Sequence, residues 1–132
     1  VYKRQALGRA QLRLIDDFIE HRNDIFCLYK NELKDLPIKI IDSPLNVIRP
    51  SRSMVAIRVQ NVEKLKEHLL KNGIDSRRFF PPIEVQNNKS NIKQLTNAQQ
   101  LRDEVLLLPT GNAISLDEVH VVCSKIKEFY NA

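Results

Sequence analysis

The sequence predicts an α+β domain, in which helices pack against a small sheet. Apolar residues recur at helical spacing over a long first stretch. Shorter patterns follow in the order strand, strand, helix, strand, loop, helix, strand and helix. The length of 132 residues is that of one domain. With 42% hydrophobic and 28% charged residues, the composition is ordinary for a soluble globular fold.

The first element is a long helix at the start of the chain. Its apolar stripe repeats at helical spacing through Leu7, Leu14, Phe18, Ile25 and Tyr29. We predict one linking helix over residues 6–35, and at roughly 45 Å it is long enough to bridge two domains or line a subunit interface. Residues 1–5, Val-Tyr-Lys-Arg-Gln, are interpreted as translated adapter sequence and left out of the fold.

Residues 36–132 are predicted to form the small α+β domain itself. A short strand is indicated by Ile38, Ile40 and Ile41. A half-buried strand is indicated over residues 54–60, where apolar and polar residues alternate. A helix is then expected to begin after Asn61, as its N-cap, and to end at Gly73.

The second half of this domain begins with a strand over residues 74–80. It is expected to stop at Pro81-Pro82, because proline has no N–H for a sheet ladder. A long polar loop is predicted over residues 83–95. The pattern Thr96-x-x-Gln99 predicts a capped helix, and the apolar run at residues 105–108 predicts a buried strand. A second capping pattern, Ser115-x-x-Glu118, opens the last helix.

No local motif for catalysis, phosphate binding or dinucleotide binding occurs in the sequence. His21, His68 and His120 have no cysteine or histidine at ligand spacing, and we predict plain surface histidines. Cys27 and Cys123 have no C-x-x-C partner, so neither a metal site nor a disulfide framework is predicted. A reducing, cytoplasmic compartment fits this cysteine usage.

The net charge of +5 admits an anionic partner. The basic residues are scattered, however, and no run of five like charges occurs, so nucleic acid is not the predicted partner. No stretch approaches the 18 or so apolar residues that a membrane span needs.

One segment stands out chemically, from Asp75 to Pro82. It joins two arginines, two phenylalanines and a rigid Pro-Pro turn. Arginine suits phosphate and carboxylate groups, so the segment could bind an anion. A strand with exposed arginine and buried phenylalanine explains the same pattern, and both interpretations stay open at this point.

Three segments together resemble one family, the DegT/DnrJ/EryC1/StrS sugar aminotransferases. Ala6–Leu12 and the helix that continues to Tyr29 resemble its long helix. Gly73–Arg77 with Phe80–Ile83 resembles its strand and substrate-facing turn. Leu107–Pro109, followed by Ile114-Ser115-x-x-Glu118 and the last helix, resembles its closing segment. The resemblance covers residues 6–130.

The resemblance implies the small C-terminal domain of a fold-type I enzyme that depends on pyridoxal phosphate. The parent would be a cytoplasmic homodimer that moves an amino group from glutamate to a keto sugar, usually linked to a nucleotide. The family's cofactor lysine lies upstream of Ala6, so this chain carries no predicted catalytic or cofactor residue and is expected to be inactive alone. Implied substrate contacts are Arg77, Phe80 and Glu84, the last standing where many relatives have histidine.

Two other functions are compatible with the residues. A free-standing module could use Arg77 and Arg78 to bind an anionic ligand or RNA, and its binding would then fall steeply with salt. A structural domain could oligomerise through the long helix, and it would form a stable dimer without any cofactor.

Overall fold

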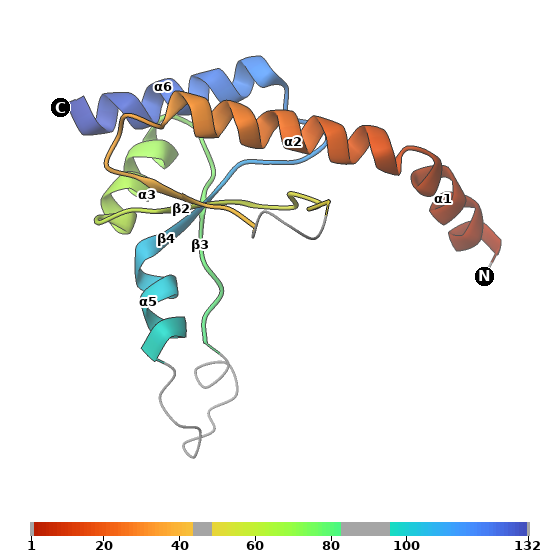
Figure 1. The fold of residues 1–132 in the computed structure, drawn as a ribbon, viewed down its shortest axis with the longest axis horizontal. Coiled ribbons are helices and arrows are strands. Elements are labelled where there is room, and N and C mark those ends of the chain that lie inside the picture. The colour runs from red at the N-terminus through yellow and green to blue at the C-terminus, as the bar shows by residue number, and fades with distance from the viewer. Residues whose placement is uncertain (1, 44–48, 83–95, 132) are drawn as a thin grey trace.

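The computed structural model describes residues 2–43, 49–82 and 96–131 (Figure 1). The described elements are α1 (Tyr2–Arg13), α2 (Ile15–Glu32), β1 (Lys39–Ile41), β2 (Val55–Arg58), α3 (Val62–Lys71), β3 (Arg77–Arg78), α5 (Thr96–Glu104), β4 (Val105–Leu108) and α6 (Leu116–Asn131). The predicted α+β class is confirmed. The polar loop predicted over residues 83–95 lies outside the described residues.

The four strands form one antiparallel sheet in the order β1-β2-β4-β3. The central strands β2 and β4 pair along their whole length, with Val55 opposite Leu108. At one edge, β3 places Arg77 opposite Leu107. Side chains alternate between the two faces of a strand. Leu106 and Leu108 therefore face the helices together with their partners Ile57 and Val55 on β2. Arg77 lies on the other face of the sheet, with Leu107.

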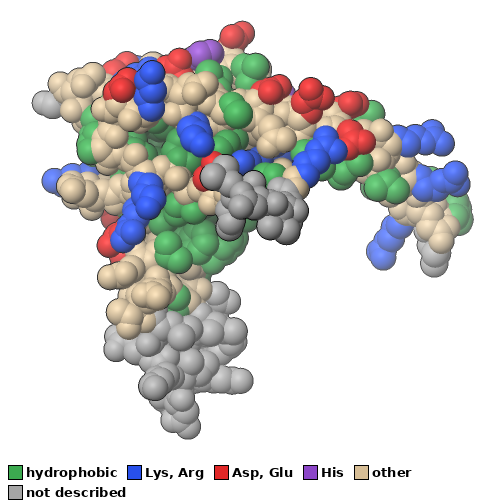
Figure 2. Space-filling model, in the orientation of Figure 1, with side chains coloured by type: hydrophobic (Ala, Val, Ile, Leu, Met, Phe, Trp, Pro, Cys, Tyr) green, Lys and Arg blue, Asp and Glu red, His purple; other side chains and the backbone are tan. Residues whose placement is uncertain are grey.

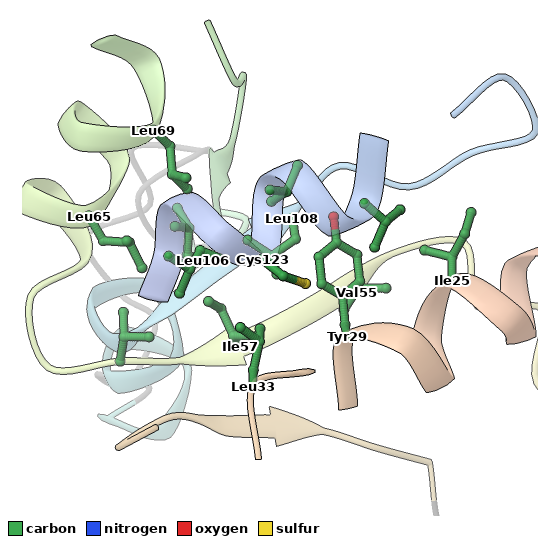
Figure 3. Packing of buried hydrophobic residues seen from close by; sticks show 14 of the residues in the cluster. Ile25, Tyr29, Leu33, Val55, Ile57, Leu65, Leu69, Leu106, Leu108 and Cys123 are labelled. Atoms are coloured by element: carbon green, nitrogen blue, oxygen red, sulfur yellow. The ribbon is translucent and has the colours of Figure 1, made fainter. Parts of the chain in front are cut away.

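The hydrophobic core lies between this sheet and the layer formed by α2, α3 and α6. Figure 3 shows side chains from these helices and from β2 and β4 converging on one cluster. Full burial of one Leu or Ile contributes about 1.5–3 kcal/mol. The fully buried members of the cluster are Ile25, Tyr29, Leu33, Val55, Ile57, Leu65, Leu69, Leu106, Val119, Cys123 and Ile126. Cys123 is one of these buried residues, and burial raises the pKa of its thiol to about 12.

Two helices occupy the stretch for which we predicted one. The helix breaks at Leu14, whose N–H donates to the carbonyl oxygen of Gln11 at 3.1 Å, three residues back. The carboxylates of Asp16 and Asp17 then stand in the first turn of α2, where the helix dipole favours negative charge. No residue of α1 is buried, and α1 projects away from the body (Figures 1 and 2). No buried side chain of α1 therefore holds the two helices in one straight rod.

The capping predictions have different outcomes. At α6 the capping box is confirmed, because Ser115 N and Oγ donate to Glu118 and the Glu118 N–H donates back to Ser115 Oγ at 3.2 Å. Asn61 precedes α3 as predicted, but its side chain makes no capping bond. Gly73 follows α3 with φ of 76°, the left-handed conformation that glycine adopts without a steric penalty.

The strand predicted over residues 74–80 is shorter than expected. Only Arg77 and Arg78 pair with β4, and one further bond follows from Phe79 N to the carbonyl oxygen of Val105 at 3.3 Å. The chain then reaches Pro81-Pro82, which cannot donate to the ladder. β3 therefore contributes side chains to the sheet edge rather than a long ladder.

Candidate functional site

The β3 segment and the loop after β4 enclose a hollow of about 590 Å³. We call it the β3 hollow, and we call residues 109–114, which form its far side, the rim loop. The remaining wall comes from the chain that leads into β2. The lining residues are Ser53, Met54, Asp75, Ser76, Arg77, Arg78, Phe80, Leu107, Leu108, Pro109, Thr110, Gly111, Asn112, Ala113 and Ile114.

Two of the three predicted substrate contacts lie in this hollow. The Arg77 side chain is 81% exposed, and its ion pair with Asp75 is long, at 3.7 Å, and solvated. Such a pair holds a guanidinium only weakly, so Arg77 can turn to an incoming anion. Phe80 is 57% exposed and meets the ring of Phe79 edge-on, with the centroids 5.7 Å apart. The third contact, Glu84, lies outside the described residues.

Arg78 has a different environment from its neighbour Arg77. It lies on the opposite face of β3 and forms ion pairs with Glu63 of α3 at 3.0 Å and Asp103 of α5 at 3.7 Å. These partners hold its half-buried guanidinium between the two helices. The two interpretations of the Asp75–Pro82 segment therefore divide between the two arginines: Arg78 is structural, and Arg77 is available to a ligand.

The hollow also contains hydroxyl groups without a protein partner. In the described part of the chain, Ser76 Oγ and Thr110 Oγ1 are buried and make no hydrogen bond. Ser76 as a whole is only 4% exposed. A buried polar atom without a partner costs free energy, and here both of these hydroxyl oxygens belong to residues that line the same hollow.

The rim loop is held by side chains of α2. Tyr29 Oη donates to the carbonyl oxygen of Pro109 at 3.0 Å, and His21 Nε2 donates to that of Ile114 at 2.9 Å. Arg22 Nε donates to Asn112 Oδ1 at 3.0 Å. Burial raises the pKa of Tyr29 well above its usual range, so the phenol keeps the proton that it donates.

The prediction of plain surface histidines is wrong for two of the three. His21 holds the rim loop, and His68 donates from Nε2 to the carbonyl oxygen of Lys125 at 3.0 Å while its ring lies 5.5 Å from that of Phe129. Helical spacing alone gave no signal for either bond, because both acceptors are carbonyl oxygens far away in the sequence. Among the residues that the structure describes, no group of histidine, cysteine and carboxylate side chains could hold a metal ion.

Arg52 supports the opposite wall of the hollow, just before Ser53 and Met54. Its φ is 48°, a left-handed conformation that costs a non-glycine residue free energy. The guanidinium is held by Asp42 at 2.5 Å, and its Cζ lies 3.7 Å from the centre of the Phe26 ring. The Arg52 guanidinium and the Lys30 ammonium hold the pKa of Asp42 below its usual range.

A second hollow, of about 560 Å³, lies near β1 and has a different character. It is lined by residues 36–39, 58–60 and 104, and none of the predicted site residues is among them. The charges of Arg58 and Glu104 meet there in an ion pair, so neither is free for a ligand. The β3 hollow is therefore the better candidate.

No helix in the described residues is long and apolar enough to cross a membrane.

Comparison with known proteins identifies the family. The model of the DegT/DnrJ/EryC1/StrS aminotransferase family matches residues 4–127. GDP-perosamine synthase from Escherichia coli O157:H7 is 29% identical over 130 residues, which are 96% of this chain and 35% of that protein. The dTDP-4-amino-4,6-dideoxy-D-glucose transaminase of Shigella dysenteriae is 26% identical over 93% of this chain and 36% of that protein. The chain thus spans about a third of the length of these relatives.

Solved structures share the fold. The S. venezuelae protein DesV, solved with a ketimine intermediate, superposes with a TM-score of 0.87 and 22% identity over 96% of this chain and 36% of that one. The aminotransferase TlmJ from Streptoalloteichus hindustanus gives a TM-score of 0.85 and 20% identity over 92% of this chain and 34% of that one. At such identities the likeness concerns the fold alone.

Proposed function

The chain belongs to the DegT/DnrJ/EryC1/StrS aminotransferase family, and on this premise we propose that it is the small C-terminal domain of a sugar aminotransferase. The parent enzyme transfers an amino group, from glutamate, to a keto sugar carried on a nucleotide. Relatives named as a GDP-perosamine synthase and a dTDP-aminosugar transaminase support this substrate class. In this proposal the parent acts as a cytoplasmic homodimer.

The proposal assigns the substrate side of the site to the β3 hollow. The observation that carries it is the exposed Arg77, which lines the hollow and, among the residues that the structure describes, has only the long ion pair to Asp75. An arginine can bind a phosphate or a carboxylate through two parallel hydrogen bonds. Phe80 adds an exposed aromatic surface to the same hollow. Glu84 remains a prediction for a contact with sugar hydroxyls.

The described residues do not fit the cofactor, pyridoxal phosphate. A cofactor lysine needs a lowered pKa or a desolvated pocket, but none of the described lysines lines the β3 hollow. Lys127 pairs with Glu32, which raises its pKa instead of lowering it. Every other described lysine is exposed or only half-buried. We therefore expect this chain to be inactive alone. Borohydride reduction with the cofactor should label no single lysine stoichiometrically, and one such lysine would contradict this expectation.

The substrate assignment is tested in the full-length enzyme with Arg77→Ala. Loss of a hydrogen bond to a charged group costs about 1.5–3 kcal/mol, so kcat/KM for the sugar should fall roughly ten- to a hundredfold. The kcat/KM for the amino donor should stay unchanged. Phe80→Ala and Glu84→Ala should lower the same sugar constant.

Arg58→Ala is the matched control for this test. Arg58 is also an exposed strand arginine with a carboxylate partner, but it lines the other hollow. Its replacement should leave the sugar constant unchanged. If Arg77→Ala changes kcat/KM for the sugar by less than about twofold, Arg77 is not a substrate contact and its assignment is withdrawn.

A further inference from the structure

The rim loop lies along α2 in the opposite chain direction. Tyr29, Arg22 and His21 follow one another toward the start of α2, and their acceptors in Pro109, Asn112 and Ile114 follow one another toward the end of the rim loop. His21 and Tyr29 are separated by roughly 12 Å along the helix axis. The loop is therefore attached at both ends and at one point between them.

The helix face that makes these bonds is itself fixed. His21, Ile25 and Tyr29 are four residues apart and share one side of α2. Ile25 and Tyr29 are fully buried in the core. The donors thus have positions set by core packing rather than by the surface loop that they bind.

Two of the three acceptors are backbone carbonyl oxygens. A bond to the backbone fixes the path of the chain, whatever side chain the loop residue carries. Residues 109–114 of the rim loop form one side of the β3 hollow. A shift of the rim loop against α2 therefore changes the width of the hollow opposite Arg77.

We propose that Tyr29, Arg22 and His21 are positioning residues, which set the rim loop and thereby the fit of the sugar substrate in the β3 hollow. They touch the loop and act through it. This inference rests on the proposed function for its substrate, but the attachment of the loop to α2 can be measured without any substrate.

Arg22 allows a sharp test because its bond uses Nε. In glutamine, Nε2 occupies the same position along the side chain as Nε does in arginine, so Arg22→Gln keeps a donor there and removes the charge. Arg22→Ala removes both. Since Arg22 and Asn112 bond at the surface, neither variant should disturb folding. Tyr29→Phe removes one hydroxyl and keeps the buried ring.

The experiment uses the full-length enzyme and two readouts. Exchange of the amide hydrogens of residues 110–114 reports the attachment of the rim loop, and steady-state kinetics report substrate fit. In Arg22→Ala and Tyr29→Phe we expect exchange in the rim loop to rise and KM for the sugar to increase about two- to tenfold, the range that loss of one hydrogen bond gives. The kcat and the constants for the amino donor should change little, and Arg22→Gln should behave as the unaltered enzyme.

Two results would overturn the inference. Unchanged exchange in both Arg22→Ala and Tyr29→Phe would show that the rim loop holds its own conformation. Faster exchange with an unchanged KM would show that α2 supports the loop without affecting the substrate. Failure of the proposed substrate site would be seen in a different measurement, as unaltered sugar kinetics in the Arg77→Ala variant. In that case the exchange data still test whether α2 holds the rim loop.

Discussion

Arg52 shows at the scale of one residue how this fold holds a conformation that is locally unfavourable. Among the described residues it is the only non-glycine residue with a positive φ, at 48°. The ion pair with Asp42 and the contact with the Phe26 ring hold its side chain. These contacts offset the local strain, and the chain turns there into the wall of the β3 hollow.

Substitutions at Arg52 should separate the effect of backbone strain on stability from the effect of the lost side chain. Arg52→Ala and Arg52→Gly both remove the guanidinium, but only glycine adopts a left-handed conformation freely. We expect the glycine variant to be more stable than the alanine variant by about 1 kcal/mol, measured by urea unfolding of the chain. Equal stabilities would show that residue 52 leaves the left-handed region at no cost.

Residue-scale features were predictable where they depend on local sequence or on a family motif. Arg77 and Phe80 were predicted as substrate contacts through the Phe-Pro-Pro segment and its resemblance. Both line the hollow, and their contact with a substrate stays a prediction. The roles of His21 and Arg22 could not be predicted, because their partners are 93 and 90 residues away. No periodicity within α2 carries information about a carbonyl oxygen at the other end of the chain.

At the scale of an element, the start of α6 couples helix stability to pH. In the folded chain the N–H and hydroxyl groups of Ser115 donate to the Glu118 carboxylate and hold its pKa below the usual range. A carboxyl group with a lower pKa in the folded state adds stability at pH values above its unfolded pKa. That contribution is lost as the pH falls through the folded pKa.

Two substitutions test this cap. Ser115→Ala should lower the free energy of unfolding by about 1 kcal/mol at neutral pH. Glu118→Gln should make stability less sensitive to acid below about pH 4, near the ordinary pKa of glutamate. Asp117→Asn, an exposed neighbour in the same turn, is the charge-matched control and should keep the acid sensitivity. Equal acid sensitivity in the Glu118→Gln chain and the unaltered chain would contradict the role of the cap.

The elements themselves were predictable to different degrees. β2, α3, β4 and α6 were predicted close to their observed bounds, because each has a clear apolar pattern and a local start or stop signal. The break at Leu14 was not predicted, since the apolar stripe continues through it. β3 is shorter than its pattern, because pairing with β4 limits it to two residues. In both cases tertiary contacts, or their absence, set the bounds.

At the scale of the whole molecule, α1 leaves an apolar surface uncovered. Leu7 and Leu12 are 64% and 68% exposed, and Leu14 and Ile15 at the break are also exposed. Figure 1 shows α1 extending beyond the helix layer and the sheet. An apolar surface of this kind is typical of a docking face in a larger assembly.

The isolated chain should therefore self-associate at micromolar concentrations through α1. Sedimentation velocity would measure this, and a hydrophobic dye would report the exposed surface. A double variant, Leu7→Lys with Leu12→Lys, should shift the chain toward monomer without changing the core, since no residue of α1 is buried. A chain that stays monomeric and binds no dye would contradict the expectation.

The short edge strands have a consequence for the form that such association takes. An edge strand becomes a template for fibrils when it offers a long row of unpaired N–H and C=O groups. Here one edge is β3, which has two residues, both arginine, and the other is β1, which has three and begins at Lys39. Such short edges with positive charges repel a second copy of the chain, and they offer it few unpaired N–H and C=O groups for strand pairing. Copies that adhere through α1 should therefore form discrete or amorphous clusters and not cross-β fibres.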